Sequence, residues 1–122
     1  MKLTNNTIYN LALALQSSFT DGTQYLPVKV NFYIQKNKAT LFNLAKDIEE
    51  ARTAILQNYG TLNEESGQYE FDAENATIAA NELNDLFNLE QEVQIYTVSI
   101  DSFGEDLSLT TGQMEALMFM ID

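Results

Sequence analysis

The sequence of 122 residues contains no cysteine, no histidine and no tryptophan. The lack of cysteine excludes disulfides, thiolate chemistry and Cys-based zinc sites. The lack of histidine removes the commonest general base and metal ligand, and without both residues neither a Ser-His-Asp nor a Cys-His catalytic set can form. The five glycines are scattered and match no phosphate-binding loop. The sequence therefore predicts a protein that is not an enzyme and carries no metal or cofactor.

Long apolar runs are also missing. No stretch approaches the roughly 18 residues needed to cross a bilayer. The opening stretch, MKLTNNTIYNLALALQ, has one lysine, an apolar run interrupted by Asn and Tyr, and no small-residue cleavage site. We expect a helix there rather than a signal peptide. The expected location is the cytoplasm, either of the producing cell or of an infected one, with no membrane partner.

Positive charge is absent from the last 70 residues. All six cations lie in the first 52 positions, where four carboxylates leave a net charge of about +2; the other fourteen carboxylates follow without a single cation. The total is −12. A field of one sign repels nucleic acid and anionic membranes and attracts cations or a basic protein surface. The sequence therefore predicts a protein partner with a basic surface, and no nucleic acid.

What is present is typical of one folded domain, residues 1–122, with 45 % apolar and 20 % charged residues. Its clearest signal is a heptad pattern that predicts one long helix from about Pro27 to Tyr59, ended by Gly60. The competing interpretation is a strand, because apolar residues alternate between Val28 and Ile34. Asn37 is the polar residue on the seam, and either fixes register or faces solvent. The seam consists of Val30, Ile34, Asn37, Leu41, Leu44, Ile48, Ala51 and Ile55.

Three shorter helices and a little sheet complete the expected fold. A helix follows an extended start at Lys2–Leu3, with Thr4 or Asn5 as its cap and a polar turn over 17–23 as its end. Residues 60–67 are predicted to form a polar loop, and Tyr69 and Phe71 either form a short strand or anchor this loop. Asp72 caps a helix over 73–89, with Ala76 and Ala79 on its buried face beside larger residues.

The last third of the chain combines a strand and a helix. Alternation over 92–103 predicts a strand whose segment 94–100 pairs with the extended start. Thr110 and Gln113 have capping-box spacing and open a final helix. Its apolar face would be Met114, Leu117, Met118 and Ile121. The sum is an α+β, mostly helical domain with one long central helix (about 27–59), three shorter helices and a small two- to three-stranded antiparallel sheet.

The aromatic residues divide into two groups. One group falls within predicted elements and is expected in the core: Phe32, Tyr33, Phe42, Phe71, Phe87, Tyr96 and Phe119. The other falls near element ends, where an amphipathic ring could anchor a partner: Tyr9, Phe19, Tyr25, Tyr59, Tyr69 and Phe103.

Residues 26–121 resemble a family of small acidic bacteriophage and prophage proteins of unknown function, found in phages of Gram-positive hosts. The first similar stretch is LPVKVNFYIQKNKATLFNLAKDIEEARTAILQNYG; the second is LNDLFNLEQEVQIYTVSIDSF with the terminal helix QMEALMFMI. The shared elements are Leu26-Pro27-Val28-Lys29, Lys36-Asn37, Glu50, Arg52 and Tyr59-Gly60. The resemblance implies a phage gene product that is not an enzyme. Residues 1–25 and 61–67 fit the pattern poorly.

Several weaker chemical signals in the sequence are more typical of exposed, solvated residues than of a functional site. The run Asp101–Asp106 lacks the ligand spacing of an EF-hand, so it is interpreted as a turn. Nothing distinguishes two carboxylates as a glycosidase pair. The lysines of the long helix are interpreted as a solvated face, with a pocket for a phosphate-rich ligand as the alternative.

Two functions follow as hypotheses. The first is a non-enzymatic phage protein that presents an acidic surface to a basic host site, as a counter-defence inhibitor would. The second is a virion or assembly accessory protein that forms a homo-oligomer through the heptad seam and the Met-rich last helix. The candidate acidic surface is Glu64, Glu65, Glu70, Asp72, Glu74, Glu82, Asp85, Glu90, Glu92, Asp101, Glu105 and Asp106.

Overall fold

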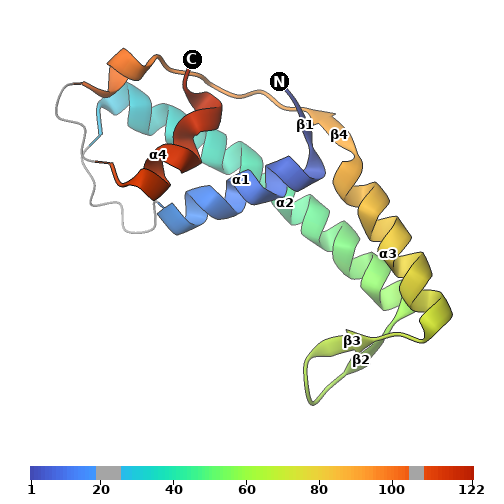
Figure 1. Ribbon diagram of the computed structural model, residues 1–122. Helices are drawn as coiled ribbons and strands as arrows, with labels where there is room; N and C mark the ends of the chain where they lie inside the picture. The colour runs from blue at the N-terminus through green and yellow to red at the C-terminus, as the bar shows by residue number, and fades with distance from the viewer. Residues whose placement is uncertain (19–25, 105–108) are drawn as a thin grey trace.

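The computed structural model describes residues 1–18, 26–104 and 109–122. Within them the chain is an α+β protein built mostly of helix, as predicted, with four α-helices and two small antiparallel sheets. Helix α2 (Val28–Tyr59) runs the length of the molecule, and the other helices pack beside it (Figure 1). Residues 19–23 of the predicted polar turn, and Glu105 and Asp106 of the predicted acidic surface, lie outside the described residues.

The long helix forms where the heptad pattern predicts it. Pro27 occupies the N-cap, and the amide of Gly60 donates to the Leu56 carbonyl at the other end. The seam faces inward: Val30, Ile34 and Leu41 have at most 1 % of their surface exposed. The strand alternative at 28–34 is therefore wrong, because the buried residues recur at the spacing of a helix and not at every second position.

Helix α1 (Asn5–Ser18) crosses the first half of α2. The Thr4 hydroxyl caps it by accepting from the Thr7 amide at 3.1 Å, as predicted. Ile8 and Leu15 are fully buried against α2. The helix includes Ser17 and Ser18, so it continues past the predicted break.

The two later helices keep their predicted caps. Helix α3 (Ala73–Asn88) begins at Asp72, whose carboxylate accepts from the Asn75 amide at 2.8 Å. Its only fully buried residue is Ala79, whereas Ala76 is exposed and does not join the buried face. Helix α4 (Thr111–Leu117) has the predicted capping box and continues as a 3-10 turn, η2 (Met118–Met120).

The predicted strand over 92–103 is wrong. The N-terminal strand β1 (Lys2–Thr4) pairs antiparallel with β4 (Glu90–Glu92), which precedes the predicted segment. Residues 93–99 run as an extended strap and residues 100–103 form a 3-10 turn, η1 (Ile100–Phe103). The alternation is real, but it buries Val93 and Val98 against helices rather than within a sheet.

Asn37 explains how the strap is held. Its side chain is fully buried, its amide nitrogen donates to the Tyr96 carbonyl at 2.9 Å, and its oxygen accepts from the Tyr96 amide at 2.8 Å. One asparagine therefore satisfies both backbone groups as a neighbouring strand would. The solvent-facing interpretation of Asn37 is wrong.

The predicted polar loop over 60–67 contains a hairpin. Strand β2 (Thr61–Asn63) pairs antiparallel with β3 (Gln68–Glu70). Gly67 takes the positive φ of 72° that closes the turn, and its amide donates to the Asn63 carbonyl. Tyr69 lies in β3, as the strand alternative for Tyr69 and Phe71 predicts, whereas Phe71 lies beyond the end of this strand.

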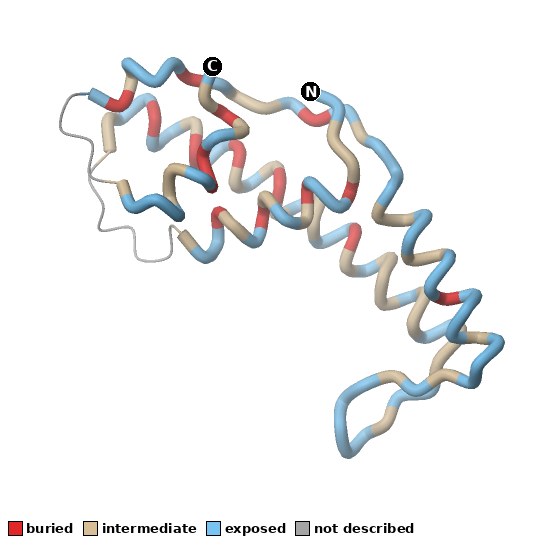
Figure 2. The backbone as a smooth tube through the Cα atoms, viewed as in Figure 1, coloured by how far each residue is buried: buried red, intermediate tan, exposed pale blue. Residues whose placement is uncertain are grey.

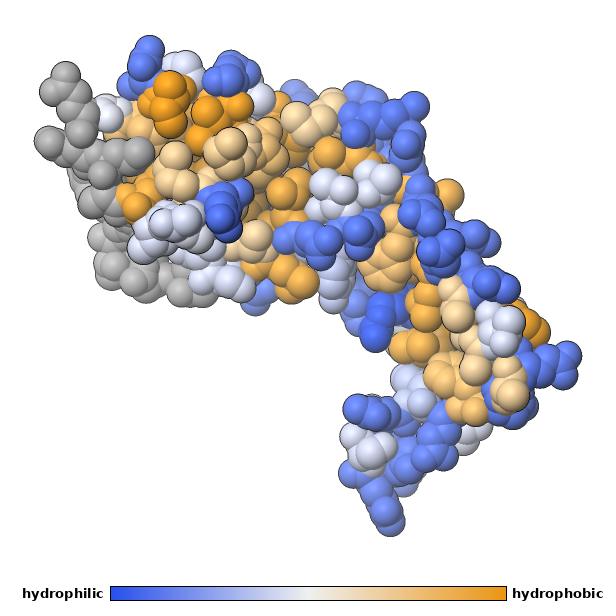
Figure 3. All heavy atoms as spheres, viewed as in Figure 1, coloured by the Kyte–Doolittle hydropathy of each residue, from blue (hydrophilic) through white to orange (hydrophobic). Residues whose placement is uncertain are grey.

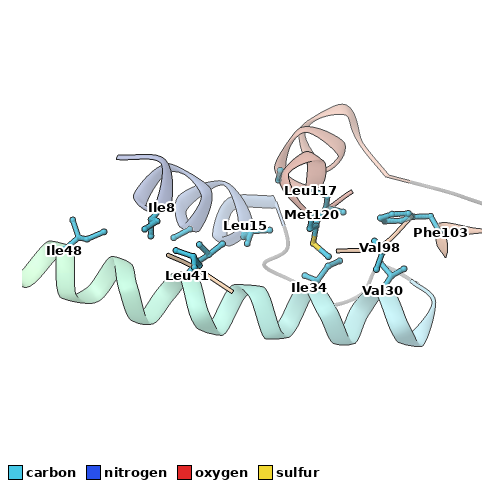
Figure 4. Packing of buried hydrophobic residues seen from close by; sticks show 13 residues of the cluster. Ile8, Leu15, Val30, Ile34, Leu41, Ile48, Val98, Phe103, Leu117 and Met120 are labelled. Atoms are coloured by element: carbon cyan, nitrogen blue, oxygen red, sulfur yellow. The ribbon is translucent and has the colours of Figure 1, made fainter. Parts of the chain in front are cut away.

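The core lies at one end of the molecule, where α1, the first half of α2, α4 and the strap meet (Figures 2 and 4). Val98, Phe103, Leu117 and Met120 cover the N-terminal part of the α2 seam. Phe103, expected as a surface anchor, is only 4 % exposed, whereas Phe32, expected in the core, is 55 % exposed. Five of the eight seam residues are buried within the chain: Val30, Ile34, Asn37, Leu41 and Ile48.

Candidate protein-binding surface

Residues 61–88 form an acidic arm, defined as β2, β3 and α3, which lies along the second half of α2 (Figure 1). The arm holds no lysine or arginine. Hydrophilic residues dominate its hairpin tip in Figure 3. Seven of the twelve predicted acidic residues lie on it: Glu64, Glu65, Glu70, Asp72, Glu74, Glu82 and Asp85.

The hairpin projects Glu64 and Glu65 into solvent. Asn63 shapes this turn, because its side-chain oxygen accepts from the Glu65 amide at 3.0 Å and from the Ser66 amide at 3.4 Å. The same side chain donates to the Glu70 carboxylate at 2.8 Å. Glu64 and Glu65 are therefore exposed neighbours in the turn of the hairpin.

The acidic residues at the cap and in the body of α3 have different structural roles. Asp72 caps the helix and Glu74 lies in its first turn, where a negative charge stabilises the helix dipole. Glu82 accepts a hydrogen bond from the Tyr59 hydroxyl at 2.8 Å, which raises the pKa of Tyr59 and ties α3 to the end of α2. Asp85 is exposed.

The remaining predicted residues lie away from the arm. Glu92 accepts from the amino group of Met1 at 2.9 Å, and this hydrogen bond, together with the positive charge, lowers the pKa of Glu92. Glu90 lies 3.6 Å from the Lys2 ammonium. Asp101 is exposed on η1, beyond the core. The predicted acidic surface is thus divided: seven of its residues lie on the acidic arm, whereas Glu90 and Glu92 lie on β4 and Asp101 lies on η1.

Two features of the arm were missed by the sequence prediction. Leu62 and Ile78 are 49 % and 37 % exposed among the carboxylates, so the surface is mixed rather than purely polar. A groove of about 410 Å³ also separates the hairpin from α2. It is lined by Arg52, Thr53, Leu56, Gly67, Gln68, Tyr69 and Phe71. The alternation in Thr-Leu-Asn and Gln-Tyr-Glu on either side of the Gly67 turn was the available signal.

The lysines of α2 do not neutralise the arm. Over the described ranges the ion pairs join the Met1 amine to Glu92, Lys2 to Glu90, and Arg52 to Glu49. Lys29, Lys36 and Lys38 instead lie over aromatic rings, with ammonium-to-centroid distances of 5.8, 5.5 and 5.4 Å. Among the described residues, none of the seven carboxylates of the arm forms an ion pair with a lysine or arginine.

The structure also has a smaller pocket on another part of its surface. A pocket of about 240 Å³ lies between α1 and α2, with Tyr9, Phe42 and Lys46 among its lining residues. In the part of the chain that the structure describes, no three acidic side chains gather as a metal site would require. No helix in this part is long and apolar enough to cross a membrane.

Comparison with known proteins adds no assignment: no protein-family model, curated protein or solved structure matches this chain.

Proposed function

We propose that this chain is a non-enzymatic phage protein that binds another protein, presenting its acidic arm to a basic host site in the host-cell cytoplasm. The observation that carries the proposal is the gathering of seven carboxylates on an arm without a cation. Carboxylates held in this way replace the phosphates that a basic groove normally binds, and their field speeds encounter. The resemblance of residues 26–121 to small phage proteins supports the phage origin and a counter-defence role.

Exposed apolar residues support a protein partner over a small cation. Leu62 and Ile78 lie among the carboxylates of the arm, and burial of such side chains stabilises protein interfaces. Charge would then set the rate and orientation of binding, while these residues contribute to its strength.

The test compares two triple variants of equal charge change. Glu64→Gln/Glu65→Gln/Asp85→Asn neutralises the exposed arm, and Asp101→Asn/Glu115→Gln/Asp122→Asn is the matched control elsewhere on the surface. Each is immobilised with the wild type and exposed to lysate of a Gram-positive host over a salt series. We expect basic, nucleic-acid-binding proteins on the wild type and the control, displaced by DNA, and at least tenfold less on the arm variant.

Binding that ignores salt, or that falls equally in both triple variants, would contradict the proposal. Circular dichroism of all three proteins establishes that they share one fold before capture is compared.

A second candidate function is a virion or assembly accessory protein that self-associates through helical faces. The exposed apolar residues of the body favour it: Val28 is 87 % exposed, Met118 is 62 % exposed and Phe32 is 55 % exposed. These three residues lie outside the heptad seam, most of which is buried within the chain.

A further inference from the structure

We propose that α2 carries a docking face for the acidic arm of a second copy of this chain, so that copies join head to tail. The docking face is defined as Val28, Lys29, Phe32 and Lys36. The proposal rests on the second candidate function, self-association, and names the two surfaces that would meet.

The four residues of the docking face share one side of α2. Their spacing of three and four positions places them opposite the buried seam residues Val30 and Ile34. All four are exposed. The Lys36 ammonium lies 5.5 Å from the centroid of the Phe32 ring, and the Lys29 ammonium lies 5.8 Å from that of Tyr33. The face thus offers an accessible ring and an apolar side chain flanked by two cations.

The base of this face is rigid. Tyr33 stacks on Tyr96 of the strap, with ring centroids 5.3 Å apart, and Asn37 one helical turn later holds the Tyr96 backbone. Phe32 lies against Tyr33 at 6.1 Å. A partner would meet a preorganised surface and lose little entropy in ordering it.

The two cations of the docking face could pair with carboxylates of a second copy. The chain has eighteen carboxylates, yet among the described residues none forms an ion pair with Lys29 or Lys36. Lys36 precedes the end of α2 by 23 residues, which is about 35 Å of helix. The arm packs beside the second half of α2, whereas the docking face lies in the first turns of this helix, so the arm of the same copy does not cover the face.

The arm supplies the matching chemistry. Glu64 and Glu65 offer the opposite charge, and Leu62, 49 % exposed beside them, offers an apolar contact for the Phe32 ring. Because the two surfaces differ, each copy can accept one neighbour and dock on another, which produces chains rather than closed dimers. The net charge of −12 opposes this at low salt, so association should be greatest at intermediate ionic strength.

Complementing variants test the proposal by sedimentation velocity. The face variant is Lys29→Gln/Phe32→Ser/Lys36→Gln and keeps its arm; the arm variant is Leu62→Ser/Glu64→Gln/Glu65→Gln and keeps its face. Wild type should grow beyond a dimer as concentration rises, and each variant alone should stay a monomer. An equimolar mixture should form pairs and nothing larger. Lys38→Gln/Lys46→Gln removes the same charge as the face variant from lysines outside the docking face and should still grow.

A wild type that stays a monomer from 0.01 to 0.5 M salt, a mixture that fails to pair, or a face variant that grows like the wild type would overturn the proposal. The face variant also separates the two ideas, because its intact arm should still capture basic host proteins. Loss of self-association with capture retained would therefore leave the first proposed function untouched.

Discussion

Asn37 shows how one residue can join a helix to an irregular segment. It replaces a strand partner for Tyr96, and its amide nitrogen also lies 3.5 Å from the Met120 sulfur. Three segments distant in sequence therefore meet at a single polar side chain in the core.

Replacing Asn37 with alanine should lower the free energy of unfolding by about 2–4 kcal/mol, because both backbone groups of Tyr96 lose their partner away from water. Urea denaturation measures the loss. Asn43→Ala, at an exposed position of the same helix, is the control and should change stability by less than about 0.5 kcal/mol. Equal effects at the two positions would show that the buried hydrogen bonds contribute nothing.

Glu92 gives a prediction on pH. The amino group of Met1 keeps this carboxylate ionised further into acid in the folded chain than in the unfolded one, since the folded pKa is lowered. The pair therefore stabilises the fold above the unfolded pKa, and its contribution disappears as pH falls through the folded pKa. Between about pH 5 and pH 3, Glu92→Gln should lose less stability than the wild type.

This difference is measured by urea denaturation at several pH values and by NMR titration of the Glu92 side chain. Glu90→Gln changes the neighbouring carboxylate on the same strand and should leave the Glu92 titration in place. Parallel pH profiles for the wild type and Glu92→Gln would contradict the prediction.

Among the elements, those with strong local signals were predicted well. The heptad pattern gave α2 almost to the residue, and the capping residues Thr4, Asp72 and Thr110 gave the starts of the other helices. Helix signals are local, so the chain itself contains most of the information.

The strap and the hairpin could not be predicted in the same way. The backbone of 93–99 finds its partners in residues distant in sequence: Asn37 for Tyr96, and Met120 and Asp122 for Val98. The hairpin has three-residue strands with little burial to shape their pattern. The candidate surface could also be predicted only in part. Its carboxylates are visible in the sequence, but only the fold shows that Glu90 and Glu92 lie on β4 and Asp101 on η1, outside the acidic arm.

The placement of the hairpin depends on Gly60. A Cβ atom there would lie 2.7 Å from the Phe71 ring and 2.9 Å from the Leu56 carbonyl oxygen, which cannot move without disturbing α2. Gly60→Ala should therefore cost about 1–3 kcal/mol. Hydrogen exchange should quicken in β2 and β3 while α1 keeps its protection.

Gly112→Ala is the control for this substitution. Its Cβ would meet nothing closer than 4.0 Å, and alanine suits a helix better than glycine, so it should be neutral or slightly stabilising. Faster exchange throughout the molecule in Gly60→Ala would show that the arm and the body unfold together.

Over the whole molecule, repulsion among carboxylates is the dominant long-range electrostatic effect. The net charge is −12, and the ion pairs found over the described residues are few and exposed. Such pairs contribute little to stability, whereas a large net charge destabilises the compact state.

Added salt should therefore raise the melting temperature. Between 0.01 and 0.15 M the Debye length falls from about 30 to about 8 Å, and each kcal/mol of screened repulsion should add about 4 °C. Differential scanning calorimetry in sodium chloride and in potassium chloride should give the same rise, because screening does not depend on the cation. A melting temperature that falls with salt would show that attractive pairs outweigh repulsion.

The tip of the acidic arm, at positions 62–66, is mostly exposed and takes no part in the hydrophobic core. Its outer residues can therefore be exchanged during evolution with little penalty to folding, because the packed interior lies elsewhere. New residues could therefore arise at positions 62–66 while the helices behind them stay constant.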